Sequence, residues 1–179
     1  MTDGGPSRKN AASSGVTLAV EVMRHGNAWP REMTDTKLKQ AARAAIRAAP
    51  PARKGTYQVT LLLTDDGEMR VLNRTWRGKD APTNVLSFPA EDSMSEPGFL
   101  GDVVLASETT RKEARAQSIA FTDHATHLVV HGVLHLLGFD HAEDAEAKRM
   151  EDRERTALAF LGIADPYAEQ PGLAEVPAS

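Results

Sequence analysis

The chain contains no cysteine in its 179 residues, which excludes disulfide bonds and thiolate metal ligands and fits a reducing compartment. It has no apolar run near the roughly 20 residues of a membrane-spanning helix. Residues 1–16 (MTDGGPSRKNAASSGV) contain no apolar segment of the kind found in secretory signal peptides. The sequence therefore predicts a soluble, cytoplasmic protein that does not associate with membranes.

Length and composition predict a single domain. A chain of 179 residues with 41% hydrophobic residues and no internal repeat is long enough for one core. Both ends are rich in proline, glycine and small residues, so we expect a disordered extension over residues 1–16 and a flexible tail over 164–179. This leaves residues 17–163 as the domain. The net charge of −4 does not by itself indicate nucleic-acid binding.

Hydrophobic periodicity predicts alternating strands and helices. We expect strands at 17–24, 57–64, 84–89 and 100–106, and helices at 34–49, 65–77, 107–117, from 122 onward and at 143–161. Strands interleaved with helices are typical of α/β and α+β proteins, and we assign the α+β class: one small mixed β-sheet packed with helices.

Three histidines, His131, His135 and His141, have the spacing of metal ligands in the segment HGVLHLLGFDH. Residues four apart on a helix share one face, so His131 and His135 can bind one ion. Gly138 can adopt the left-handed conformation that ends a helix, and the chain then returns with His141. Three protein ligands and one open position are typical of hydrolytic zinc sites. We predict one zinc ion per chain at the end of this helix, although copper and nickel also bind such ligands tightly.

Two further histidines, His124 and His127, precede this trio on the same predicted helix. Successive steps of four residues drift around a helix, so one ion is not expected to bind His127, His131 and His135 together. We expect His124 and His127 to be partly exposed or hydrogen-bonded neighbours of the site.

Charged residues form three local clusters. Seven acids are expected on the solvated side of the last helix: Asp140, Glu143, Asp144, Glu146, Glu151, Asp152 and Glu154. Two basic clusters are Arg70, Arg74, Arg77 and Lys79, and Lys37, Lys39, Arg43 and Arg47. We interpret the second basic cluster as ordinary helix surface.

Gly132 lies directly after the first of the three histidines. The trio has the spacing of the zinc-peptidase pattern H-E-x-x-H-x-x-G-x-x-H, but Gly132 stands where those enzymes carry a general-base glutamate. Peptide cleavage by the usual route is therefore not expected. Glycine inside a helix costs about 1 kcal/mol relative to alanine, so we expect another group to approach the backbone closely there.

Four separated segments resemble the YbeY family over roughly residues 57–167. They are LNRTWRGKDAPTNVLSFP, FLGDVVLASE, HGVLHLLGFDH and LGIADPY. The family comprises bacterial zinc-dependent endoribonucleases that act in maturation of ribosomal RNA, notably the small-subunit 3′ end, and in ribosome quality control. The resemblance implies a single-strand-specific endoribonuclease of the cytoplasm. Its implied partners are ribosomal RNA and a ribosomal subunit or ribosome-associated proteins.

The same resemblance assigns roles to individual residues. His131, His135 and His141 match the family's zinc ligands, and Arg77 matches an arginine important for activity. A guanidinium can bind a phosphate through two hydrogen bonds and stabilise charge that grows on its oxygens. The chain has Trp76 where tyrosine or phenylalanine is frequent. It has Asn84 where aspartate is frequent, and an amide cannot act as a general base.

Two alternative functions stay open. The first is a ribosome-assembly binding factor with a mainly structural zinc and weak or partner-dependent nuclease activity. The second is an atypical metallopeptidase, against which Gly132 counts. The sequence does not fix the nucleophile, water or the ribose 2′-hydroxyl, or the oligomeric state.

Overall fold

The computed structural model describes residues 15–93 and 96–168, which form four strands and five helices. The strands are β1 (Val16–Arg24), β2 (Gly55–Thr64), β3 (Val85–Pro89) and β4 (Phe99–Ala106). The helices are α1 (Asp35–Ala48), α2 (Asp66–Arg77), α3 (Ser107–Ala116), α4 (Phe121–Leu136) and α5 (Asp144–Phe160). Every element expected from the sequence is present, and its observed ends differ from the expected ones by at most two residues.

The ends of the chain test the expected domain boundaries only in part. Residues 1–14 and 169–179, which belong to the expected extension and tail, lie outside the described residues. Within the described part, β1 begins at Val16, and Tyr167 hydrogen-bonds to Glu154 of α5. Tyr167, which lies in the segment expected to be a flexible tail, therefore contacts α5. No helix in the described ranges is both long enough and apolar enough to cross a membrane.

The strands form one mixed sheet in the order β1-β2-β4-β3. The β1–β2 and β2–β4 pairs are parallel, and β3 lies antiparallel to β4 at one edge. Parallel neighbours need crossover connections, which the intervening helices supply. The expected α+β fold with a small mixed sheet is confirmed.

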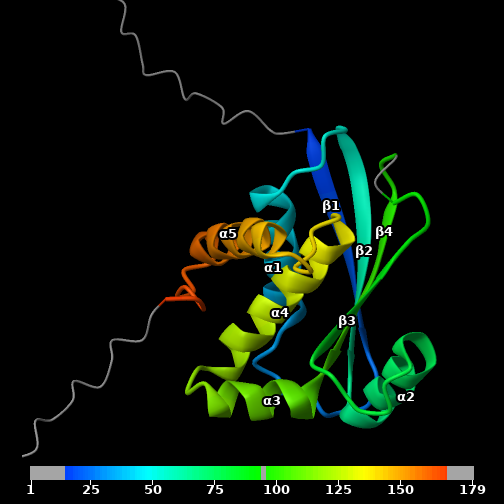
Figure 1. The fold of residues 1–179 in the computed structure, drawn as a ribbon, viewed down its shortest axis with the longest axis vertical. Coiled ribbons are helices and arrows are strands. Elements are labelled where there is room, and N and C mark those ends of the chain that lie inside the picture. Colours follow the sequence, from blue (N-terminus) through cyan, green and yellow to red (C-terminus); the bar gives the residue numbers. More distant parts are fainter. Residues whose placement is uncertain (1–14, 94–95, 169–179) are drawn as a thin grey trace, which may run out of the picture.

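The two faces of the sheet are covered differently (Figure 1). Helices α1, α4 and α5 lie on one side of the sheet and α2 lies on the other. In β2, Val59, Leu61 and Leu63 are fully buried against the first group of helices, whereas Thr60 and Leu62 point to the opposite face and are only half-buried. The main core therefore lies on the α1, α4 and α5 side.

Gly132 is the point at which α4 packs directly on the sheet. The Ser87 hydroxyl of β3 donates a hydrogen bond of 2.9 Å to the Gly132 carbonyl oxygen. A Cβ atom built on Gly132 would lie 2.5 Å from Cγ1 of Val103 in β4. The expected close approach at Gly132 is confirmed, and it brings the histidine-bearing helix against β3.

We predict that Gly132→Ala lowers the free energy of unfolding by about 1–3 kcal/mol, the usual cost of overpacking a core. The roughly 1 kcal/mol advantage of alanine in a helix offsets only part of this cost. Val103 is fully buried and β-branched, so it cannot easily move away. Urea denaturation measures the change. Gly67→Ala in exposed α2 is the control, because its Cβ meets only the Asp65 side chain, at 3.2 Å. Equal losses in both variants would contradict this explanation.

Candidate metal centre

Three histidine side chains converge where α4 ends. His131 and His135 come from α4, and His141 comes from the loop that follows it. One ligand nitrogen from each lies within 4.8 Å of the other two, and Nε2 of His131 lies 3.1 Å from Nε2 of His135. Nitrogens bound at about 2.1 Å to a tetrahedral ion are roughly 3.4 Å apart. The geometry therefore suits one metal ion.

A Schellman turn returns the chain toward α4. Gly138 adopts a left-handed conformation with φ of +88°. Its N–H donates to the His135 carbonyl at 3.0 Å, and the Phe139 N–H donates to the Leu134 carbonyl at 3.1 Å. The Asp140 carboxylate then accepts from the His141 N–H at 2.7 Å. The expected helix end at Gly138 is confirmed, and it brings His141 back to the helical pair.

A buried carboxylate orients the first histidine. The Glu154 side chain on α5 is 1% exposed and accepts a 2.5 Å hydrogen bond from Nδ1 of His131. It also accepts from Nε2 of His127 at 3.1 Å and from the Tyr167 hydroxyl. Because Nδ1 of His131 carries the proton, its Nε2 keeps a lone pair directed toward His135. This is the tautomer in which a histidine binds a metal through Nε2.

Burial and hydrogen bonding shift the pKa values of these groups. Burial acts to raise the pKa of Glu154, but the hydrogen bonds from His127, His131 and Tyr167 outweigh it and lower the pKa to about 2. Burial and the charges of His131 and His141 lower the pKa of His135 to about 4. Burial, followed by the Glu154 hydrogen bond and charge, raises the pKa of Tyr167. Near neutral pH, His135 is therefore in the neutral form that metal binding requires.

The expectation that Glu154 lies on the solvated side of the last helix is wrong. The other six acids of that cluster are exposed or half-buried, but Glu154 is fully buried. Met150, Ala157 and Leu158 lie four before, three after and four after it on α5, and all three are buried. This spacing places Glu154 on the apolar face of the helix, and it was readable from the sequence.

The two other α4 histidines do not belong to the converging trio. Nε2 of His124 lies 2.7 Å from the Glu113 carboxylate of α3, and His127 is bonded to Glu154. The expectation that both are hydrogen-bonded neighbours is confirmed. His124 is more buried than expected, at 5% exposure.

The trio opens into a cleft of about 570 Å³ that is also lined by Arg77 at the end of α2. Arg77 is exposed, and within the described ranges its side chain makes no hydrogen bond or ion pair. Arg70 and Arg74, in contrast, are paired with the Asp80 carboxylate, at distances of 2.8 and 3.8 Å. Lys79 is exposed but does not line the cleft. Of the three arginines in the first basic cluster, Arg77 is therefore the one that lines the cleft of the histidines with a guanidinium free to bind a ligand.

Asn84 also lines the cleft, but its amide is engaged within the protein. Its Nδ2 donates to both Glu113 carboxylate oxygens, at 3.1 and 2.9 Å. Its Oδ1 accepts from the Val85 N–H at 2.7 Å. These bonds hold the start of β3 against α3 and give Asn84 a structural part in the wall of the cleft.

Sequence comparison finds close relatives along most of the chain. The model of the family described as Endoribonuclease YbeY matches residues 25–162. The protein named Endoribonuclease YbeY from Paramagnetospirillum magneticum is 48% identical over 162 residues, which cover 87% of this chain and 99% of the relative. The protein of the same name from Parvibaculum lavamentivorans is 45% identical over 186 residues, covering 96% and 98%.

Structural comparison supports the same fold. The solution structure of TM1509 from Thermotoga maritima superposes with a TM-score of 0.53 and 21% sequence identity. The match covers 84% of this chain and all of that one. The family match and the two relatives confirm the resemblance seen in the sequence, and the chain belongs to the Endoribonuclease YbeY family.

Proposed function

We propose that this protein is a metal-dependent hydrolase, a single-strand-specific endoribonuclease that acts in maturation of the small-subunit ribosomal RNA 3′ end and in ribosome quality control. The observation that carries the proposal is the placement on one cleft of three convergent imidazoles and an arginine that has no carboxylate partner among the described residues. Membership of an endoribonuclease family gives the substrate class, RNA.

We assign the metal ligands as His131, His135 and His141 and the metal as zinc, one per chain. Three imidazole nitrogens suit zinc and leave a fourth position for water or substrate. The Glu154 hydrogen bond holds His131 in the required tautomer. When bound, the ion supplies Lewis acidity that polarises a phosphoryl oxygen or lowers the pKa of a water molecule toward about 7.

Arg77 is the residue that binds and neutralises the scissile phosphate. Arg77 lines the same cleft as the histidines, and its guanidinium has no competing carboxylate among the described residues. A planar fork of N–H donors matches two phosphate oxygens and stabilises the charge that grows on them during attack. Asn84 takes no proton, because it is an amide and both of its polar atoms are bonded inside the protein.

The partners in this proposal are single-stranded ribosomal RNA and a ribosomal subunit or ribosome-associated proteins, in the cytoplasm. The alternative of an assembly factor with a mainly structural zinc is not favoured. A structural zinc site is normally closed by four protein ligands, whereas here three ligands face an open cleft.

Arg77→Ala is expected to reduce kcat for cleavage of single-stranded ribosomal RNA by about 10²–10³, the usual loss when a charge-stabilising donor is removed. Zinc content should stay at one ion per chain. Gel analysis of a fragment from the small-subunit RNA 3′ end measures the rate, and the product ends identify the nucleophile. Arg74→Ala, which removes an arginine already paired with Asp80, is the matched control. Cleavage by Arg77→Ala at the wild-type rate would show that Arg77 does not act in catalysis. Equal cleavage by the wild type, Arg77→Ala and His135→Ala would assign the activity to a contaminant.

His135→Ala is expected to lose both the metal and RNA cleavage while keeping the fold and RNA binding. Removal of the metal from the wild type by EDTA should abolish cleavage, and added zinc should restore it. Metal analysis, circular dichroism and RNA-binding titrations measure these effects. Suppose instead that His135→Ala lowers the melting temperature and RNA binding together while Arg77→Ala changes nothing. The assembly factor would then be the better description.

Glu154→Gln is expected to weaken zinc binding by about 10–100-fold, the usual effect of losing the hydrogen-bond partner of a ligand histidine. Glutamine removes the charge that orients Nδ1–H of His131 with little change in volume. Competition with a chromophoric chelator measures the affinity. Glu151→Gln, one turn earlier on α5 and half-exposed, is the control. Zinc affinity equal to that of the wild type would show that Glu154 does not orient the ligand.

A further inference from the structure

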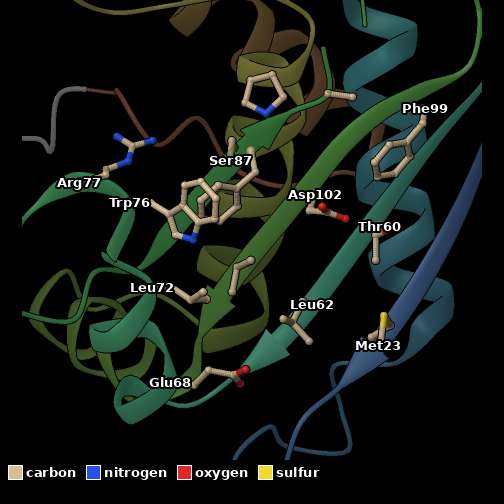
Figure 2. Close-up of a pocket in the computed structure, with 14 residues that line it drawn as sticks. Met23, Thr60, Leu62, Glu68, Leu72, Trp76, Arg77, Ser87, Phe99 and Asp102 are labelled. Atoms are coloured by element: carbon tan, nitrogen blue, oxygen red, sulfur yellow. The ribbon is translucent and has the colours of Figure 1, made fainter. Parts of the chain in front are cut away.

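A second cavity adjoins the metal cleft on the outer face of the sheet. Its volume is about 720 Å³, within the range of small-molecule sites, and its lining is mainly apolar. Arg77, Ser87 and Pro89 line both cavities, so the two are continuous. Figure 2 shows Trp76 and Arg77 side by side at its margin, with Asp102 and Thr60 on the strands that form its floor.

The cavity exists because α2 covers only part of the outer face. Leu62 and Val104 are paired across β2 and β4 and pack beneath α2 in a small apolar cluster. The next row across the sheet comprises Thr60, Asp102 and Phe88, aligned by the β2–β4 and β3–β4 pairings. These three residues line the cavity together with Leu62 and Val104 of the neighbouring row, so α2 leaves this part of the outer face open beside the metal cleft.

Large apolar side chains are exposed around this cavity. Trp76 is 68% exposed, and Phe99 and Met23 on its rim are also exposed. The Trp76 ring contacts the Phe88 ring edge-on, with centroids 5.9 Å apart and an interplanar angle of 67°. This contact steadies the indole and leaves much of it open to solvent. Unpaired RNA bases stack on exposed aromatic rings of this kind, which a neighbouring side chain holds in place.

Asp102 supplies a hydrogen-bond acceptor on the cavity floor. Its side chain is half-buried, and within residues 15–93 and 96–168 it makes no side-chain hydrogen bond or ion pair. The other carboxylate in the lining, Glu68, is already bonded to His25 and Thr64. A carboxylate repels phosphate but accepts hydrogen bonds from the amino groups of bases. The charges therefore favour a phosphate at Arg77 and a base inside the cavity.

We propose that this cavity is a base-binding subsite of the endoribonuclease. It receives one unpaired nucleobase of the RNA strand adjacent to the phosphate held by Arg77. Trp76 stacks on the base, and Asp102 accepts a hydrogen bond from its exocyclic amino group. The subsite therefore selects cytosine, adenine or guanine over uracil, whose equivalent group is a carbonyl. The inference rests on the proposed function, because that function places the phosphate of the RNA strand at Arg77.

Binding of oligocytidylate and oligouridylate tests the subsite. Fluorescence anisotropy measures affinity in EDTA, where cleavage is prevented, and cleavage rates are measured with the zinc-loaded protein. The wild type should bind oligocytidylate about tenfold more tightly than oligouridylate. Asp102→Asn should abolish this preference, because an amide can donate to uracil as well as accept from cytosine.

Trp76→Ala should weaken binding of both oligonucleotides by about 5–100-fold, the usual range for one stacked base, and Trp76→Phe should restore most of it. Folding should survive, because the indole is largely exposed. Phe160→Ala and Asp123→Asn are the controls: Phe160 is a 43% exposed aromatic residue and Asp123 an exposed acid, and neither lines the cavity. Both should bind like the wild type.

The two readouts separate this inference from the proposed function. If Trp76→Ala and Asp102→Asn bind both oligonucleotides like the wild type, the subsite is wrong whether or not RNA is cut. This is also the result expected if the cavity receives a protein segment. If the variants change binding as expected but no protein cuts RNA, the base subsite stands and the endoribonuclease proposal fails.

Discussion

The contact between the Glu154 carboxylate and His131 joins the packing of the protein to the chemistry of its metal centre. A buried, ionised carboxylate without partners would cost several kcal/mol, so α5 can pack on α4 only where donors meet Glu154. His127, His131 and Tyr167 supply those donors. The hydrogen bond that makes burial tolerable also fixes the proton of His131 on Nδ1 and leaves Nε2 for the metal. The helical part of the centre is thus set by the core, and His141 alone comes from an exposed loop.

The alternation of β3 divides the functional surface into two parts. Successive side chains of a strand point to opposite faces, so neighbours on β3 make their main contacts on different sides of the sheet. Ser87 points to α4 and bonds the Gly132 carbonyl, whereas Phe88 points to the outer face and contacts Trp76. Arg77 ends α2, just before Gly78 with φ of +69°, and borders both cavities. A β3 strand one residue out of register would exchange these faces and remove the Phe88 ring from its contact with Trp76.

The strands and helices, the histidine trio and the turn at Gly138 could be predicted from local sequence patterns. Spacing along a helix and the conformational freedom of glycine depend on only a few neighbouring residues. The metal-ligand role of the trio and the phosphate-binding role of Arg77 stay proposals, and the latter came from the family resemblance rather than from spacing. Glu154 was missed because it ends a run of acids that looks uniformly solvated, although its spacing from Met150, Ala157 and Leu158 places it on the apolar face of α5. The apolar cavity could not be predicted, since Asp102 and Phe88 meet only through the pairing of β3 with β4.

Packing at Gly132 also explains why this ligand spacing does not make a peptidase. In zinc peptidases of the same spacing, the general-base glutamate follows the first histidine directly. Here that position faces β4, where even a Cβ atom would lie 2.5 Å from Val103. A glutamate would need the sheet to move away from α4, which would also break the bond from Ser87 to the Gly132 carbonyl. The packing of α4 on β4 at Gly132 therefore leaves no room for a general-base glutamate. A phosphodiester suits the remaining groups better than a peptide, because it carries the negative charge that an unpaired Arg77 can bind.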